Sequence, residues 1–312
     1  MARPSSVTVT EVGPRDGFQS ESEYIDTDIK TELVNDLIGC GVPRIEVSSF
    51  VSPRAVPQLK DAEKVFADID RSSECTLAAL VPNVKGALRA VEAGVDEMVV
   101  FVSASESHNS KNVNRSIDES LDSFEEVVRI AENALIRVHG DIATAFGCPF
   151  EGDVSVEKVG YVAKRYQELG INSISLGDTT GMATPPIVST TCQHLAREFP
   201  ELSLTLHFHN TRGIGLANVI AGLDEGIAGY EASFGGIGGC PFAPKATGNI
   251  CTEDLVYLLQ ELGIETGIDL VKLCDIARVV ETVVDRELPG QVMKAGMRLD
   301  LHPFEDARTA VG

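Results

Sequence analysis

Short apolar runs alternate with longer amphipathic segments along most of the chain. Eight runs rich in β-branched residues have the length of buried strands, and the segments between them repeat apolar residues at helical spacing. The predicted strands are residues 7–12, 44–49, 76–81, 97–103, 141–146, 173–176, 202–209 and 230–234. The predicted helices between them are residues 28–39, 58–69, 83–93, 117–137, 156–169, 185–199 and 215–226.

Several residues mark where these helices begin and end. Ser116 and Glu119 have the spacing of a capping box, and a Pro185-Pro186 pair suits a first helical turn. Glycines follow four of the helical segments, where a left-handed backbone would end the helix. These glycines are Gly41, Gly94, Gly170 and Gly226.

Regular alternation of strand and helix predicts a parallel sheet, and eight such units predict closure into an α/β fold of the (β/α)8 TIM-barrel type. The alternative is an open, doubly wound sheet. That fold would favour a glycine-rich phosphate turn after the first strand, but residues 13–17 do not fit the G-x-G-x-x-G pattern. Segments 253–262 and 269–286 predict extra C-terminal helices. We therefore expect one domain over residues 1–297 and a tail over 298–312.

Composition narrows the class of protein. Apolar residues make up 43% of the chain, but the apolar runs are too short to cross a bilayer. Lysine and arginine number 26 against 47 aspartates and glutamates, a net charge of −21. Such an acidic chain argues against nucleic acid or an anionic membrane as a partner. An anionic ligand would need positive charge concentrated at its site.

The seven cysteines are scattered and form no C-x-x-C pair, which is typical of free thiols in a reducing compartment. The first six residues have no apolar signal-peptide core before the first predicted strand. The sequence therefore predicts a cytoplasmic protein.

Two histidines close the seventh predicted strand. His207 and His209 are two residues apart, so their side chains point to the same face of a strand. Neighbouring imidazoles at a strand end are half of a metal site, or else a hydrogen-bonded polar strand end. Partners at the ends of other strands would decide between these readings.

Such partners follow the first and eighth strands. Asp16 supplies a carboxylate and Asn249 an amide oxygen, which together with the imidazoles suit an octahedral Mg²⁺ or Mn²⁺ ion. Zinc would prefer more nitrogen or sulfur ligands. Arg15, next to Asp16, could stabilise an oxyanion near the metal, or form a structural ion pair.

Three further residues near predicted strand ends are candidates for chemistry. Cys240 lies in a glycine-rich loop and could act as an acid-base group, or be a buried thiol. Glu46 could tune the charge near Arg15 or act as an acid-base group, or be a structural partner of an arginine. His108, after the fourth strand, is a weaker candidate for substrate contact.

The chain resembles the 3-hydroxy-3-methylglutaryl-CoA lyase family, a group of metal-dependent barrel lyases, over about residues 7–293. Each motif that carries the resemblance is weak alone, but the set is specific to the family in this order and spacing. The motifs are VGPRDG at 12–17, SFVSPR at 49–54, GCPFEG at 147–152, SLGDT at 175–179, GGCP at 238–241, GN at 248–249 and TEDLVY at 252–257. The related condensing synthases generally lack the cysteine of the GGCP loop.

The resemblance implies a retro-Claisen cleavage of 3-hydroxy-3-methylglutaryl-CoA to acetyl-CoA and acetoacetate. The family's metal ligands fall on Asp16, His207, His209 and Asn249. Its catalytic arginine, cysteine and glutamate fall on Arg15, Cys240 and Glu46. Arg15 would stabilise the enolate oxygen and Cys240 would protonate its carbon, while Asp16 and His207 both remain candidates to take the hydroxyl proton. The implied partners are a CoA-thioester substrate and other copies of this chain in a dimer or larger homo-oligomer.

Departures from the family pattern leave the acyl group open. Residues 210–213 read NTRG where the lyases carry DTYG, Lys245 stands where glycine is usual, and the stretch 106–110 is polar. Arg212 would suit a more polar acyl group, for example that of citramalyl-CoA, or be a surface charge. A condensing synthase is a further alternative. The expected substrate-binding residues are Gln19, His108, Asp178, Thr179 and Arg212.

Overall fold

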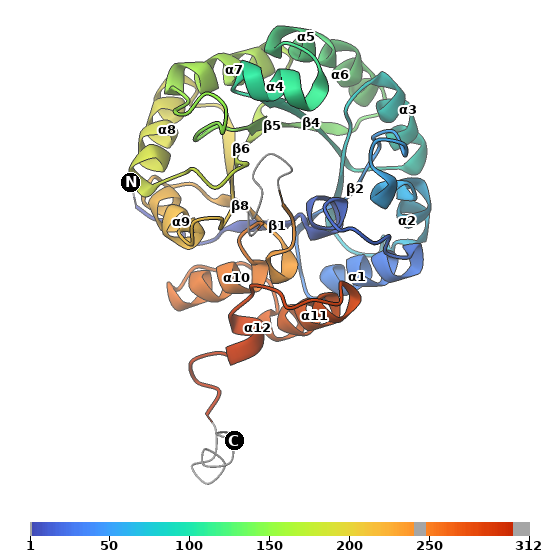
Figure 1. Cartoon of the computed structure of the whole chain (residues 1–312), viewed down its shortest axis with the longest axis vertical. Helices are drawn as coiled ribbons and strands as arrows, with labels where there is room; N and C mark the ends of the chain where they lie inside the picture. Colours follow the sequence, from blue (N-terminus) through green and yellow to red (C-terminus); the bar gives the residue numbers. More distant parts are fainter. Residues whose placement is uncertain (1, 240–247, 302–312) are drawn as a thin grey trace.

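Eight parallel strands close into a barrel in the computed structural model, which describes residues 2–239 and 248–301 (Figure 1). Each strand pairs with the next along the chain, and β8 pairs with β1. The strands are β1 (Thr8–Glu11), β2 (Arg44–Ser49), β3 (Thr76–Leu80), β4 (Glu97–Ser103), β5 (Arg137–Ala143), β6 (Ser173–Asp178), β7 (Ser203–Phe208) and β8 (Gly229–Ala232). The predicted (β/α)8 barrel is confirmed.

Helices surround the strands, as Figure 1 shows. They are α1 (Thr27–Gly39), α2 (Ala62–Asp68), α3 (Val84–Ala93), α4 (Glu106–Val113), α5 (Ile117–Asp122), α6 (Phe124–Asn133), α7 (Val156–Glu168), α8 (Pro185–Glu198) and α9 (Gly215–Asp224). After β8 come α10 (Thr252–Glu261), α11 (Leu270–Val283) and α12 (Val292–Ala295). These three pack on one another, and α11 also contacts α1, so the C-terminal helices are joined to the barrel. No helix within the described ranges is long and apolar enough to span a membrane.

The predicted helix boundaries are largely confirmed. The Ser116–Glu119 capping box forms at the start of α5, and the proline pair begins α8. The four glycines after helical segments all have positive φ, between +71° and +91°. An L-residue rarely adopts this backbone, so glycine is the residue that ends a helix there.

The single helix predicted over residues 117–137 is wrong. It is divided at Ser123 into α5 and α6, and β5 already begins at Arg137 instead of at residue 141. The turn between α6 and β5 falls at Leu135, which is 95% exposed and adopts a φ of +58° although it is not a glycine. No glycine or proline marks this turn in the sequence. The shift places His139 on a barrel strand, where it is buried.

The inside of the barrel is mostly polar. Alternate residues of each strand point inward, and on β2, β5, β6 and β8 these include ionisable or hydroxyl groups. Their outward neighbours, such as Ile142 and Ile174, join the apolar core under the helices. One inner wall is apolar instead, formed by Ala78, Leu80 and Val99 with Val51 and Phe101. The inside of the barrel thus presents one charged side and one apolar side to a ligand.

Candidate active site and metal centre

A cavity of about 460 Å³ opens at the carboxyl ends of the strands, the end of a (β/α)8 barrel where active sites lie. Its polar side carries most of the ionisable residues singled out in the sequence, and its other side is the apolar wall. The polar lining comprises Arg15, Asp16, Gln19, His108, Asn112, Asp141, Ser175, Thr179, His207, His209 and Glu231. The apolar lining includes Val51, Val56, Leu80, Pro82, Phe101 and Val113.

Arg15 and Asp16 lie on a single π-helical turn, Gly13–Gly17, that follows β1. π-Helical turns are uncommon in proteins, and those that do occur often lie at functional sites. The turn is fixed by the buried carboxylate of Glu11. Its Oε1 accepts hydrogen bonds from the amides of Gly13 (2.7 Å) and Phe234 (3.0 Å), and Oε2 accepts one from the Thr252 hydroxyl (2.6 Å). The turn is thereby joined to the segment that follows β8 and to the start of α10.

The Arg15 guanidinium bridges two carboxylates. Nη1 lies 2.6 Å from Asp16 Oδ1 and Nη2 lies 2.7 Å from Glu46 Oε2, with all three groups largely buried. Burial disfavours a charged Asp16, but Arg15 and the two histidines outweigh it and lower the pKa of Asp16. Burial dominates at Glu46 and raises its pKa despite Arg15. The predicted proximity of Glu46 to Arg15 is therefore present in the structure.

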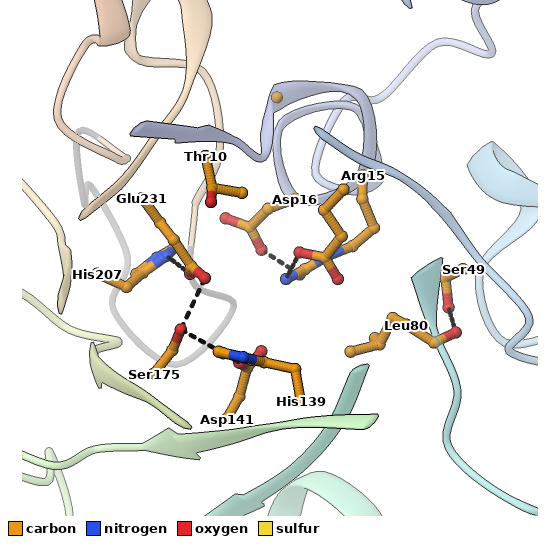
Figure 2. Close-up of polar contacts among 12 residues, drawn as sticks. Thr10, Arg15, Asp16, Ser49, Leu80, His139, Asp141, Ser175, His207 and Glu231 are labelled. Atoms are coloured by element: carbon orange, nitrogen blue, oxygen red, sulfur yellow. Dashed lines mark hydrogen bonds and ion pairs between the residues drawn. The ribbon is translucent and has the colours of Figure 1, made fainter. Parts of the chain in front are cut away.

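His207 and His209 face each other inside the cavity, with their Nε2 atoms 3.2 Å apart. His207 Nδ1 lies 3.0 Å from Glu231 Oε2 (Figure 2). Burial lowers the pKa of His207, but the hydrogen bond and charge of Glu231 outweigh it and raise this pKa to about 9. Burial and the neighbouring His207 charge lower the pKa of His209 to about 3. At neutral pH the protonated His207 therefore donates from Nε2 to the unprotonated Nε2 of His209.

The donor set fits a divalent ion. Single ligand atoms of Asp16, His207 and His209 all lie within 4.8 Å of one another. Asn249, paired with His209 through a β-bridge, donates from Nδ2 to Asp16 Oδ2 at 2.8 Å. Its buried Oδ1 has no hydrogen-bond partner in the described part of the chain. Buried polar atoms are nearly always satisfied, so an amide oxygen without a partner beside a carboxylate and two imidazoles suits a bound cation.

Glu231 is the most important residue that the sequence analysis missed. It connects His207 to the barrel interior, because Oε1 accepts from the Ser175 hydroxyl at 2.7 Å and from Arg44 Nη1 at 3.3 Å. Ser175 Oγ in turn lies 2.8 Å from His139 Nε2. Metal-binding histidines usually donate their second N–H to such a carboxylate. The signal for Glu231 in the sequence is a glutamate at an inward-facing position of an otherwise apolar strand.

The expected substrate-binding residues divide into two groups. Gln19, His108 and Thr179 line the cavity. Asp178 and Arg212 are not among its lining residues. Asp178 Oδ1 accepts from the amides of Met182 (2.6 Å) and Ala183 (2.8 Å), and burial raises its pKa to about 7.

Arg212 is exposed, and its Nη1 donates to the Thr180 carbonyl oxygen at 3.1 Å. In this structure it therefore holds the loop after β6, and its role with substrate stays a prediction. Cys240 lies outside the described residues. Gly239, which precedes it in the sequence, lines the cavity.

Comparisons with known proteins agree with this geometry. The HMGL-like family matches residues 6–280. The hydroxymethylglutaryl-CoA lyase YngG of Bacillus subtilis is 44% identical over 291 residues, covering 93% of this chain and 97% of that protein. A 3-hydroxy-3-isohexenylglutaryl-CoA/hydroxymethylglutaryl-CoA lyase of Pseudomonas aeruginosa is 43% identical over 95% of this chain and 98% of its own length. The structure of an HMG-CoA lyase from A. baumannii in complex with coenzyme A and 3-methylmalate superposes with a TM-score of 0.92 at 46% identity, covering 96% and 98% of the two chains.

Proposed function

The chain belongs to the HMGL-like family, and on that premise we propose that it is a carbon-carbon lyase that cleaves 3-hydroxy-3-methylglutaryl-CoA to acetyl-CoA and acetoacetate. The observation that carries this proposal is the meeting of Asp16, His207 and His209 in one cavity at the active end of the barrel. The metal is Mg²⁺ or Mn²⁺, because the donor set mixes oxygen with only two nitrogen ligands.

Asp16, His207, His209 and Asn249 would hold this ion. When bound, it supplies Lewis-acid polarisation of the substrate's hydroxyl and carboxylate oxygens. Arg15 is fixed by its two carboxylate partners, so its guanidinium is held in the cavity, where it would stabilise the oxygen on which enolate charge develops.

Removal of the hydroxyl proton breaks the carbon–carbon bond, with Asp16 and His207 as the candidates to accept that proton. The thioester half leaves as an enolate, whose carbon takes a proton from Cys240. This role of Cys240 rests on the family resemblance.

The cavity also supports a CoA thioester as substrate. Its apolar wall can cover the methylene and methyl groups of an acyl chain, while its charged wall meets the oxygens. We extend the proposal to a homo-oligomer, a dimer or larger, in the cytoplasm. The six cysteines in the described ranges are all free thiols, which suits a reducing compartment. Light scattering should give a mass of at least twice 33.4 kDa.

A cleavage assay over a panel of 3-hydroxyacyl-CoA thioesters, with products identified by mass, tests the activity. We expect acetyl-CoA and acetoacetate from 3-hydroxy-3-methylglutaryl-CoA, lost on chelation and restored by Mg²⁺ or Mn²⁺. Preferred cleavage of citramalyl-CoA would change the acyl group but keep the reaction class. Condensation of acetyl-CoA onto a 2-oxo acid without any thioester cleavage would contradict the proposal.

Variants of single histidines supply the matched comparison. His207→Ala and His209→Ala should each abolish cleavage and weaken Mn²⁺ binding. His194→Ala removes an imidazole from α8, away from the cavity, and should change neither quantity. Equal loss in all three variants would show that the effect is general and not a property of the site.

A further inference from the structure

Asp141, on β5, is an inward-facing carboxyl group to which neither the motifs nor the metal set assign a role. It lines the cavity together with Arg15, His207 and Glu231, and its side chain is 20% exposed. Among the described residues, its nearest basic atom is His139 Nε2, 3.6 Å from Oδ1 and too far for a hydrogen bond. No donor in the described part of the chain reaches either carboxyl oxygen, and Oδ1 is buried. Figure 2 shows Asp141 beside His139, across the drawn group from Asp16 and Arg15.

The positive charges inside the barrel are already paired with other carboxylates. Arg15 contacts two of them, and Arg44 lies 2.7 Å from Glu97 and 3.3 Å from Glu231. Within residues 2–239 and 248–301, Asp141 therefore has neither an arginine or lysine partner of its own nor a hydrogen-bond donor. An ionised carboxylate in that position would be costly, whereas a neutral acid would not. Burial first, then the charges of Glu231 and Glu46, raise the pKa of Asp141 well above its usual range.

A neutral carboxyl group that lines a substrate cavity is a hydrogen-bond donor. An acyl chain of the 3-hydroxy-3-methylglutaryl type presents carboxylate and carbonyl oxygens, which can only accept. We propose that Asp141 binds the acyl chain of the substrate by donating a hydrogen bond to one of its oxygen atoms, and so helps to select the acyl group. This inference rests on the proposed lyase function and adds a binding residue to the same site.

A second metal ion is the competing use of the same carboxyl group. Ligand atoms of His139, Asp141 and Glu231 also lie within 4.8 Å of one another. However, both nitrogens of His139 are 2.8 Å from serine hydroxyls, and both oxygens of Glu231 accept hydrogen bonds from the barrel interior. Only Asp141 has an unused oxygen, so an ion would have to break a satisfied network.

Two substitutions of similar size separate these possibilities. Asp141→Asn keeps a neutral donor, whereas Asp141→Leu keeps the volume and removes the hydrogen bond. Calorimetry in Mg²⁺ would measure the affinity of each variant for free 3-hydroxy-3-methylglutarate and for CoA alone. We expect Asp141→Leu to bind the glutarate on the order of 10- to 100-fold more weakly, since a buried acceptor of the ligand is left unpaired. Asp141→Asn should keep most of the wild-type affinity, and CoA binding should be the same in all three proteins.

A control variant and kinetics complete the test. Ser173→Ala removes a hydrogen bond to His139 at the opposite end of the barrel and should leave glutarate affinity unchanged. For 3-hydroxy-3-methylglutaryl-CoA, the change in Asp141→Leu should fall mainly on KM. Equal losses in Asp141→Asn and Asp141→Leu, or unchanged affinity in Asp141→Leu, would overturn the proposal. So would two Mn²⁺ ions per chain in the wild type and one in Asp141→Asn.

Failure of this inference is distinguishable from failure of the lyase function. A wild-type enzyme that cleaves the thioester while Asp141→Leu binds the glutarate normally would overturn only the role of Asp141. A wild-type protein that binds CoA but neither binds the glutarate nor cleaves its thioester would overturn both.

Discussion

Glu231→Gln tests whether the carboxylate behind His207 sustains the metal centre. One oxygen of Glu231 accepts from His207 Nδ1 at 3.0 Å, and the other accepts from Ser175 and Arg44. Glutamine keeps the shape but has only one accepting atom at its end. Whichever way its amide turns, an NH₂ group faces either His207 or the Ser175–Arg44 pair. The substitution therefore sets a donor against a donor in a buried place.

The magnitude follows from the bond that is lost. A hydrogen bond to a charged group contributes about 1.5–3 kcal/mol, which corresponds to roughly 10- to 150-fold in an equilibrium constant. Loss of a carboxylate behind a metal-binding histidine typically costs about 10- to 100-fold in metal affinity or activity. We therefore expect Glu231→Gln to bind Mn²⁺ about 10- to 100-fold more weakly and to lose kcat/KM by a similar factor.

Mn²⁺ titration followed by electron paramagnetic resonance would measure the affinity, with Glu97→Gln as the matched control. Glu97 is the other carboxylate of Arg44, at 2.7 Å, but it makes no contact with His207. The control should lose some stability and little metal affinity. Wild-type Mn²⁺ affinity in Glu231→Gln, or equal weakening in both variants, would refute the reasoning.

Three further predictions concern the turn after β1 and a buried carboxyl group. Arg15→Met should lower kcat by about 100- to 1,000-fold, as expected for a donor to a developing oxyanion, and a loss confined to KM would argue against that role. Gly17→Ala would place a Cβ atom 2.4 Å from Ile237 Cγ1, so we expect about 1–3 kcal/mol lower stability in urea unfolding, and an unchanged midpoint would contradict the close packing. Burial raises the pKa of Glu253 from 4.5 to about 8. The folded state therefore keeps a proton that the unfolded chain loses, and the free energy of unfolding falls as the pH rises between these two values. The Tm of Glu253→Gln relative to wild type should therefore increase from pH 5 to pH 8.5, and a constant difference would show that Glu253 does not titrate in this range.

The barrel was predictable from the sequence because each unit carries local signals. Glycines at helix ends and the Ser116–Glu119 box act within a few residues, and they mark the same boundaries in the structure. Leu135 shows the limit of such signals. It adopts a positive φ between α6 and β5, and nothing in its side chain predicts a turn there.

The candidate site was predictable where residues follow strand ends and hidden where they lie inside strands. Asp16, His207 and His209 meet in one cavity, as their places at strand ends predicted. Glu231 and Asp141 escaped because their importance depends on which phase of a strand faces inward, and for β5 the predicted start was four residues late. Distances between side chains on different strands are a property of barrel closure, which a linear pattern does not contain.

The ion pairs inside the barrel also bear on how this sequence can change over time. Arg44 joins β2 to Glu97 on β4 and to Glu231 on β8, and the same Glu231 supports His207. Removing one member of a buried pair leaves an uncompensated charge, whereas replacing the whole set by apolar residues can be neutral. Substitutions at these three positions should therefore be strongly epistatic. We expect these three residues to change together in evolution. Glu231 is the most constrained of them, because it pairs with Arg44 and also supports His207.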